Sequence, residues 1–113
     1  MKISLEEPYK QFFGTLANQV RIDIIKHLRN GNSNVTEMIK KTGHEQSTIS
    51  HSLKRLEECG FVTVIPNGKT RVYSINKKTV KPLFALMELH MNNYCKHVVQ
   101  NRSDKNERKK VCH

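Results

Sequence analysis

Apolar side chains recur every three or four residues over the first half of the chain, the spacing that places them on one face of an α-helix. From Ser4 to about Thr15 this stripe predicts an amphipathic first helix with unusually large apolar groups. Its members are Leu5, Tyr9, Phe12, Phe13 and Leu16. Asn18 is then a good N-cap for a second helix, which Gly31 ends. Its predicted core face consists of Ile22, Ile25 and Leu28.

Two more helices follow, and each carries signals for its ends. Asn34, with Glu37 three residues later, forms a capping box that opens a short third helix over residues 35–42. The fourth helix is predicted between Gly43 and Gly60. Glu45 is placed to accept hydrogen bonds from the first-turn amides, and Gly60 suits a left-handed C-cap. The apolar stripe of this helix is narrow and consists of Ile49, Leu53 and Leu56.

After Gly60 the hydrophobic period changes. β-Branched and aromatic residues alternate with polar ones over residues 61–75, around Pro66-Asn67-Gly68, which is a strong β-hairpin signal. From Thr79 to Val98 the helical spacing returns, and Pro82 is tolerable because it falls in the first turn. The predicted order is helix, helix, helix, helix, strand, strand, helix. That order is typical of a mainly α-helical (α+β) winged helix-turn-helix.

The fourth helix also has an unusual polar face, with short hydrogen-bonding side chains first and cations later. Such a face suits a helix whose N-terminal half enters the major groove of DNA. Gln, Ser and Thr reach base edges there, while cations hold phosphates. An ordinary solvated face is more often built from Glu and Lys four residues apart. With cations from the second helix and the hairpin tip, the candidate DNA-binding residues are Arg21, Gln46, Ser47, Thr48, Ser50, His51, Lys54, Lys69 and Arg71.

The charge of the chain points to a polyanionic partner. Among 113 residues, 20 Lys and Arg outnumber 10 Asp and Glu, for a net charge of +10 and a pI near 9.8. A membrane surface would attract the same charge. However, no apolar run approaches the roughly 20 residues of a membrane span, and the N-terminus lacks a signal peptide's apolar core. We therefore expect a cytoplasmic protein with one domain over residues 1–100 and a basic, flexible tail over residues 101–113.

Several alternatives remain open at this stage. Arg21 is able to form a surface salt bridge with Asp23 or Glu45 instead, and Thr48 and Ser50 are able to bond their own helix backbone. A winged helix used for protein–protein contacts would need an apolar or acidic recognition face, unlike the face predicted here. The sequence has no nucleophile elbow, P-loop, zinc-protease motif or glycine-rich turn before a helix. Neither an enzyme nor a small-molecule substrate is therefore expected.

Three segments resemble the arsenical-repressor-type (ArsR/SmtB) transcriptional regulators. They are LANQVRIDIIKHL, QSTISHSLKRLEECGFV and GKTRVYSI, in the order and at the spacing typical of that family. The resemblance covers about Phe12 to Tyr94. One departure is that the histidine usual in the second segment stands at position 51 here, with Ser52 after it. The resemblance implies a repressor that binds double-stranded DNA.

Regulators of this type are typically homodimers joined through their first and last helices, with two recognition helices in successive major grooves. The two terminal stripes of this chain agree, because they offer more apolar surface than so short a winged helix covers internally. The expected dimer-interface residues are Leu5, Tyr9, Phe12, Leu83, Met87, Met91 and Tyr94.

Many regulators of this type release DNA when they bind a metal ion. One version of the site uses cysteines at the start of the third helix, where this chain has only Asn34-Val35-Thr36-Glu37. A second version uses a carboxylate and histidines on the last helix. Here that helix offers His90 and His97, but an amide, Gln100, replaces the final carboxylate. The alternative to a metal-free repressor is thus one that binds zinc or another divalent ion through His90, Cys95, His97, Cys112 or His113.

Overall fold

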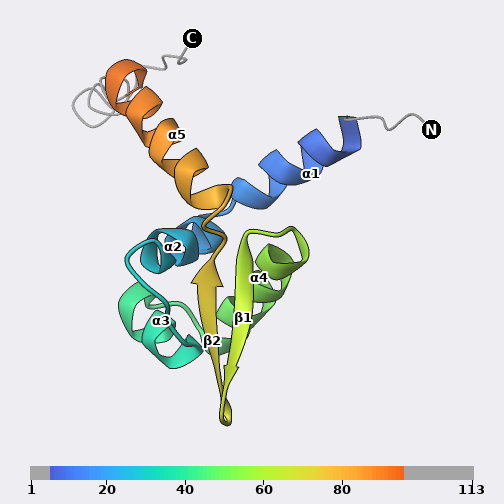
Figure 1. Ribbon diagram of the computed structural model, residues 1–113, viewed down its shortest axis with the longest axis vertical. Helices are drawn as coiled ribbons and strands as arrows, with labels where there is room; N and C mark the ends of the chain where they lie inside the picture. Colours follow the sequence, from blue (N-terminus) through green and yellow to red (C-terminus); the bar gives the residue numbers. More distant parts are fainter. Residues whose placement is uncertain (1–5, 96–113) are drawn as a thin grey trace. The chain divides into compact units, whose positions relative to one another are not determined.

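The computed structural model describes residues 6–95, which form five helices and a two-stranded antiparallel sheet (Figure 1). The helices are α1 (Glu6–Leu16), α2 (Gln19–Leu28), α3 (Val35–Thr42), α4 (Gln46–Glu58) and α5 (Val80–Tyr94). Strands β1 (Val62–Asn67) and β2 (Thr70–Ile75) lie between α4 and α5 in the sequence. The predicted order of elements is confirmed.

The chain divides into two compact units, Met1–Asn76 and Lys77–His113. The first holds α1 to β2 and the second holds α5. The predicted tail, residues 101–113, lies outside the described residues, so its boundary stays a prediction.

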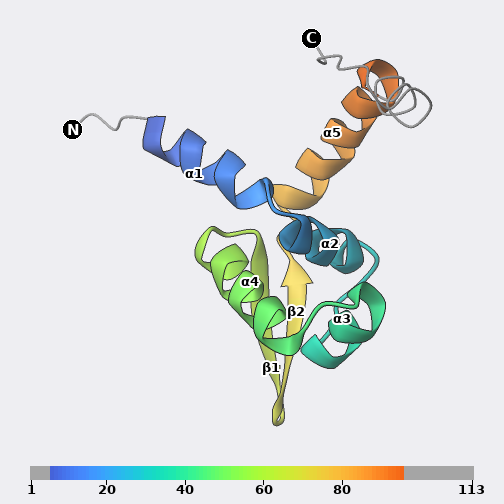
Figure 2. The same cartoon turned by 180° about the vertical axis from the view of Figure 1, so that it is seen from behind.

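The core of the first unit forms where α2, α3, α4 and the hairpin meet (Figure 2). The buried apolar residues of these elements and of the link to β1 are Ile24, Ile25, Leu28, Met38, Ile49, Leu53, Leu56, Phe61, Val62, Tyr73 and Ile75. The predicted stripe of α4 is therefore confirmed. In α2 the prediction was incomplete, because Ile24 is fully buried while Ile22 is only half-buried. The reason is that α2 packs on α3, α4 and β2 together, which requires a broader apolar face.

Local capping chemistry accounts for several of the helix ends. Asn18 and Asn34 each accept a hydrogen bond from the amide three residues later, as predicted. The Glu37 side chain does not complete the capping box, because its carboxylate accepts from Ser33 Oγ at 3.0 Å. The predicted cap by Glu45 is wrong, since its side chain makes no capping bond to α4.

The C-terminal ends of α3 and α4 depend on glycine. Gly43 ends α3 with φ of +79° and Gly60 follows α4 with φ of +80°, left-handed conformations that favour glycine. After α4, Gly60 N donates to Glu57 O and Phe61 N donates to Leu56 O. These two bonds form a Schellman motif, which directs the chain from α4 into β1.

The hairpin forms a wing that extends beyond the helices of its unit (Figure 1). Val62 pairs with Ile75 and Asn67 with Thr70, which leaves Gly68 and Lys69 as a two-residue turn. Gly68 has φ of +65°, as such turns require. Ser33 adds an isolated antiparallel bridge to Tyr73 of β2.

Helix α5 buries Val80 and Phe84 and has Pro82 in its first turn, as predicted. It ends at Tyr94 with Cys95 as its C-cap, and Val98 lies outside the described residues. None of the described helices is long and apolar enough to span a lipid bilayer.

Candidate nucleic-acid interface

The exposed face of α4 carries most of the predicted DNA-binding residues. Burial of Ile49, Leu53 and Leu56 fixes which side of the helix faces the core. The opposite side therefore presents its polar groups to solvent. Exposed on it are Gln46, Ser47, Ser50, His51 and Lys54, and Thr48 is half-buried. His51 is exposed and Ser52 is buried, so the histidine of this segment belongs to the solvent face.

A groove of about 720 Å³ borders this face. Its walls come from α4, the start of α3 and the wing. The lining residues are Asn34, Val35, Thr36, Ser50, Lys54, Glu57, Lys69, Thr70, Arg71 and Tyr73. The structure thus brings together Ser50, Lys54, Lys69 and Arg71 from the predicted set, while the remaining predicted residues do not line the groove.

The groove carries an excess of positive charge. Three cations, Lys54, Lys69 and Arg71, face one carboxylate, Glu57, among the lining residues. The first residues of α3 contribute Val35 and Thr36, and helix N-termini favour anions through their free amides. Sequence reasoning missed Asn34 and Thr36 as groove residues, although the N-cap signal at Asn34 had located this helix start.

Arg21 has a different environment from the other predicted cations. It is half-buried, and its Nη1 donates to the Thr15 carbonyl at 3.1 Å. Its Nε is buried without a hydrogen-bond partner in the described part of the chain. The guanidinium therefore ties the end of α1 to the start of α2. A phosphate contact by Arg21 stays a prediction.

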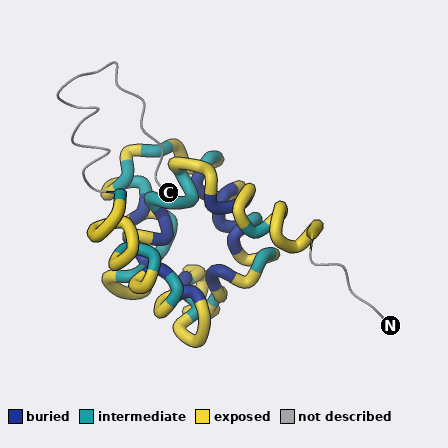
Figure 3. Tube along the Cα trace, turned by 90° about the horizontal axis from the view of Figure 1, so that it is seen from above, coloured by how far each residue is buried: buried dark blue, intermediate teal, exposed yellow. Residues whose placement is uncertain are grey.

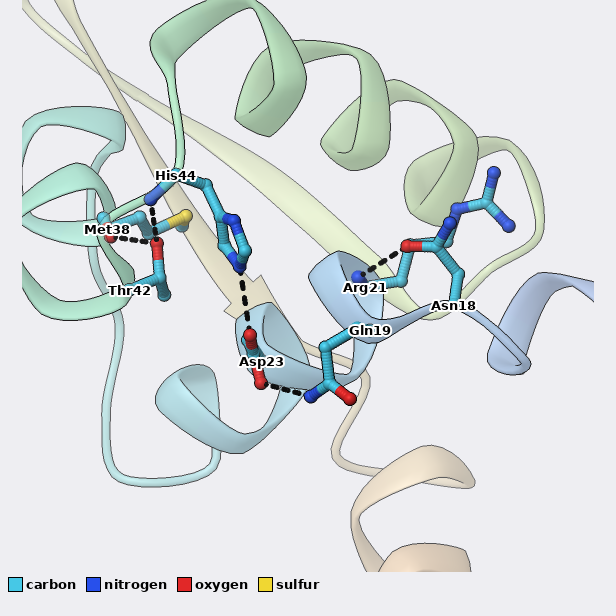
Figure 4. Close-up of polar contacts among 7 residues, drawn as sticks. All are labelled: Asn18, Gln19, Arg21, Asp23, Met38, Thr42 and His44. Carbon is cyan, nitrogen blue, oxygen red and sulfur yellow. Dashed lines mark hydrogen bonds and ion pairs between the residues drawn. The ribbon is translucent and has the colours of Figure 1, made fainter.

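A polar network joins α2 to the segment before α4 (Figure 4). Asp23 Oδ2 lies 2.9 Å from His44 Nε2, and Asp23 Oδ1 accepts from Gln19 Nε2 at 2.8 Å. The hydrogen bond from His44 is the main cause that holds the pKa of the Asp23 carboxyl below its ordinary value. Partial burial acts in the opposite direction, and Gln19 and the nearby Lys26 add to the lowering. Sequence reasoning missed this contact because His44 is 21 residues from Asp23.

Large apolar side chains are exposed on both terminal helices. On α1, the exposed fractions of Tyr9 and Phe13 are 59% and 60%. In Figure 3 most of the turns of α1 are coloured as exposed. Phe12 is half-buried, with its ring centroid 5.3 Å from that of Phe61. On α5 the exposed apolar residues are Leu86, Leu89, Met91 and Tyr94.

The predicted dimer residues are therefore only partly on exposed surface. Tyr9, Met91 and Tyr94 are exposed, whereas Phe12, Leu83 and Met87 are half-buried. Leu5 lies outside the described residues. Phe13, Leu86 and Leu89 were not among the predicted interface residues, although helical spacing had placed Phe13 in the first stripe.

The candidate metal ligands are mostly outside the described residues, namely His97, Cys112 and His113. Of the other two, His90 is exposed, with its ring centroid 4.9 Å from that of Tyr94. Cys95 is half-buried at the end of α5 and is disulfide-bonded, so its sulfur is not the free thiolate that the predicted metal site needs. Among residues 6–95, no three His, Cys, Asp or Glu side chains are grouped as metal ligands would be.

Comparison with known proteins identifies the helix-turn-helix segment. Residues 18–64 match the family described as bacterial regulatory protein, arsR family. The HTH-type transcriptional regulator NmtR of Mycobacterium tuberculosis is 40% identical over 60 residues, which are 53% of this chain and 50% of that protein. A probable mercury resistance operon repressor of Streptomyces lividans is 29% identical over 76 residues, which are 67% of this chain and 61% of that protein. The chain thus spans about half to three-fifths of these relatives.

Solved structures share the architecture. One is the solution structure of the homodimeric winged helix-turn-helix DNA-binding domain of a possible ArsR-family regulator from Mycobacterium bovis. It has a TM-score of 0.69 and 25% identity, with 95% of this chain and 91% of that chain covered. The solution structure of apo-NmtR has a TM-score of 0.69 and 28% identity, with 85% and 82% covered.

Proposed function

Since residues 18–64 form a helix-turn-helix domain of the arsR family of bacterial regulatory proteins, we propose that this chain is a sequence-specific, double-stranded-DNA-binding transcriptional repressor. The observation that carries the proposal is the exposed polar face of α4, which borders a groove lined by Lys54, Lys69 and Arg71. The absence of catalytic motifs from the sequence and the regulatory family both argue against an enzyme. A protein that regulates bacterial transcription works in the cytoplasm, which we propose as its location.

Side-chain chemistry indicates which of these residues contact bases and which contact phosphates. Gln46, Ser47, Thr48, Ser50 and His51 lie in the first two turns of α4, where short polar groups reach base edges. Lys54 and the wing cations, Lys69 and Arg71, hold phosphates on either side of the groove. The start of α3, at Val35 and Thr36, adds a further phosphate contact through its free amides. Arg21 is the weakest member of the set, because Thr15 already accepts a hydrogen bond from its guanidinium.

We further propose that the repressor is a homodimer. Exposed aromatic and aliphatic side chains on α1 and on α5 support this, since large exposed apolar patches mark interfaces. The homodimeric state of the Mycobacterium bovis domain supports it as well. A two-fold dimer would present two copies of α4 to two half-sites about one helical turn of DNA apart.

The proposed repressor lacks a cysteine metal site on α3, because residues 35–42 contain no cysteine. The second candidate is a repressor that responds to a metal ion through α5 or the C-terminal segment. It is favoured by the similarity to a probable mercury resistance operon repressor and by the exposed His90 on α5. Zinc or a similar ion would suit an imidazole nitrogen of this kind.

One experiment tests both candidates. The full chain is used to select bound sequences from random double-stranded DNA, with and without added zinc and other divalent ions. We expect one enriched, inversely repeated sequence in both conditions. Enrichment that disappears on addition of a metal ion would favour the metal-responsive candidate. Recovery of unenriched DNA in every condition would contradict sequence-specific regulation.

A further inference from the structure

The segment between α3 and α4 is tied to α2 by one side chain, His44. It lies between Gly43, which ends α3, and Glu45, the N-cap of α4. Its backbone amide donates to Thr42 Oγ1 at 3.3 Å, and its ring Nε2 bonds Asp23 Oδ2 at 2.9 Å (Figure 4). Gln19 occupies the other carboxylate oxygen of Asp23. We call the bond between Asp23 and His44 the clasp.

The clasp requires a hydrogen on His44 Nε2, opposite a carboxylate oxygen of Asp23. The pKa of Asp23 is lowered, so its carboxylate is ionised at neutral pH and only accepts hydrogen bonds. His44 Nε2 must therefore carry a hydrogen, which both the imidazolium and one neutral tautomer provide. The exposed fractions of the two side chains are 28% and 29%, so the bond is partly shielded from water. A partly shielded, charge-assisted bond is stronger than a typical surface contact.

The start of α4 has few other polar contacts to orient it. The Glu45 side chain makes no capping bond. Within the described chain, no other side chain of residues 43–48 is hydrogen-bonded to α2. Apolar packing of Ile49, at the end of the first turn, and of Leu53 fixes which side of the helix faces the core. His44 is only two residues before Gln46, so the clasp acts where the proposed base-reading residues begin.

We propose that the clasp is a positioning element for DNA recognition, which holds the first turn of α4 so that Gln46 and Thr48 meet base edges in register. This inference rests on the proposed DNA-binding function. Base reading tolerates displacements of only about half an ångström, whereas contacts between cations and phosphates tolerate more. Loss of the clasp therefore weakens binding to the preferred sequence and leaves binding to random DNA unchanged.

The test compares two amides at position 44. In His44→Gln, the amide nitrogen takes about the place of Nε2 and reaches Asp23. In His44→Asn, the side chain is one methylene shorter and does not reach. The ratio of Kd on random duplex to Kd on the selected operator is measured for both, with thermal midpoints. We expect His44→Asn to lower this ratio about tenfold and His44→Gln to keep it close to the wild-type value.

Gln19→Ala is the matched control, because it removes the other bond to Asp23 without loosening α4. Its ratio should equal that of the wild type. The inference is overturned if the two amides behave alike, or if His44→Asn weakens both duplexes by the same factor. A wild type without any sequence preference would overturn the proposed function itself, and this inference with it. If His44→Asn fails to fold, Asp23→Ala takes its place in the comparison with His44→Gln. Asp23→Ala should lower the ratio of the two Kd values, whereas His44→Gln should keep it.

Discussion

Gln46 and Lys54 are both exposed on α4, in its first and third turns, but they offer different chemistry to DNA. An amide can donate and accept in the pattern that an adenine edge presents, so its contribution depends on sequence. An ammonium group neutralises phosphate charge, which every sequence carries alike. The difference separates specificity from affinity within a single helix.

We predict that Gln46→Ala costs about 1–3 kcal/mol on the selected operator and relaxes its specificity. Lys54→Ala should instead weaken operator and random DNA equally and reduce the dependence of binding on salt. Fluorescence anisotropy with both duplexes at several salt concentrations measures these effects. Equal, small losses on both duplexes for both variants would speak against base reading by α4.

The same residues show what sequence reasoning could reach. Gln46, Ser50 and Lys54 were identifiable because a helix period of 3.6 separates them from Ile49, Leu53 and Leu56. Their exposure on α4 follows from that local rule. The clasp was not identifiable, because no spacing rule connects Asp23 with His44. Glu45 looked like the capping residue by local rules, yet its neighbour makes the bond that reaches α2.

At the scale of elements, the loop before α3 also fastens the wing. Ser33 is buried, and its backbone exchanges hydrogen bonds of 3.1 and 2.7 Å with Tyr73 of β2. Its hydroxyl donates to Glu37 of α3 and lies 2.8 Å from His27 Nε2 of α2. Because the hydroxyl proton is used on Glu37, His27 Nε2 is the donor in the second bond. One serine thus connects two helices with the hairpin.

We predict that Ser33→Ala lowers the free energy of unfolding by about 1 kcal/mol, because the half-buried His27 and the exposed Glu37 each lose a hydrogen bond. The urea midpoint should fall at constant m-value. Ser47→Ala is the matched control, since Ser47 is exposed at the start of α4 and should leave the midpoint unchanged. An equal midpoint shift in both variants would contradict a specific role of Ser33.

The ends of the helices and strands were more predictable from the sequence than the residues that pack against each of them. The range of α3 and the left-handed glycines at its end and after α4 follow from capping chemistry within a few residues. The burial of Ile24 depends on elements that pack on α2 from other parts of the sequence. The partial burial of Phe12 depends on Phe61, 49 positions later in the sequence. Local periodicity carries no information on such partners. Local periodicity could not show that the Phe12 ring contacts Phe61, and a place for Phe12 in the dimer interface stays a prediction.

At the scale of the whole molecule, exposed apolar side chains remain on the terminal helices. Tyr9 and Phe13 stack with centroids 6.4 Å apart on α1, yet both are more than half exposed. A shallow apolar pocket of about 330 Å³ lies among them, lined by Pro8, Tyr9, Phe12 and Phe13. Leu86 and Leu89 are similarly exposed on α5. Apolar side chains gain nothing from exposure to water, and the proposed dimer would bury them.

We therefore predict that Phe13→Asp and Leu86→Asp each convert a dimer into a folded monomer at micromolar concentration, measured by sedimentation. Both side chains are exposed within the protomer, so the new aspartate is not buried in the protomer core. A loss of assembly would therefore not result from unfolding of the protomer. Gln11→Asp and Asn92→Asp are matched controls, because each adds the same charge to an exposed polar position of the same helix. They should remain dimers.

The monomers should lose tight binding to a two-half-site operator and keep weak binding to one half-site. A wild type that sediments as a monomer, or dimers that persist in both apolar-site variants, would show that these faces serve another purpose.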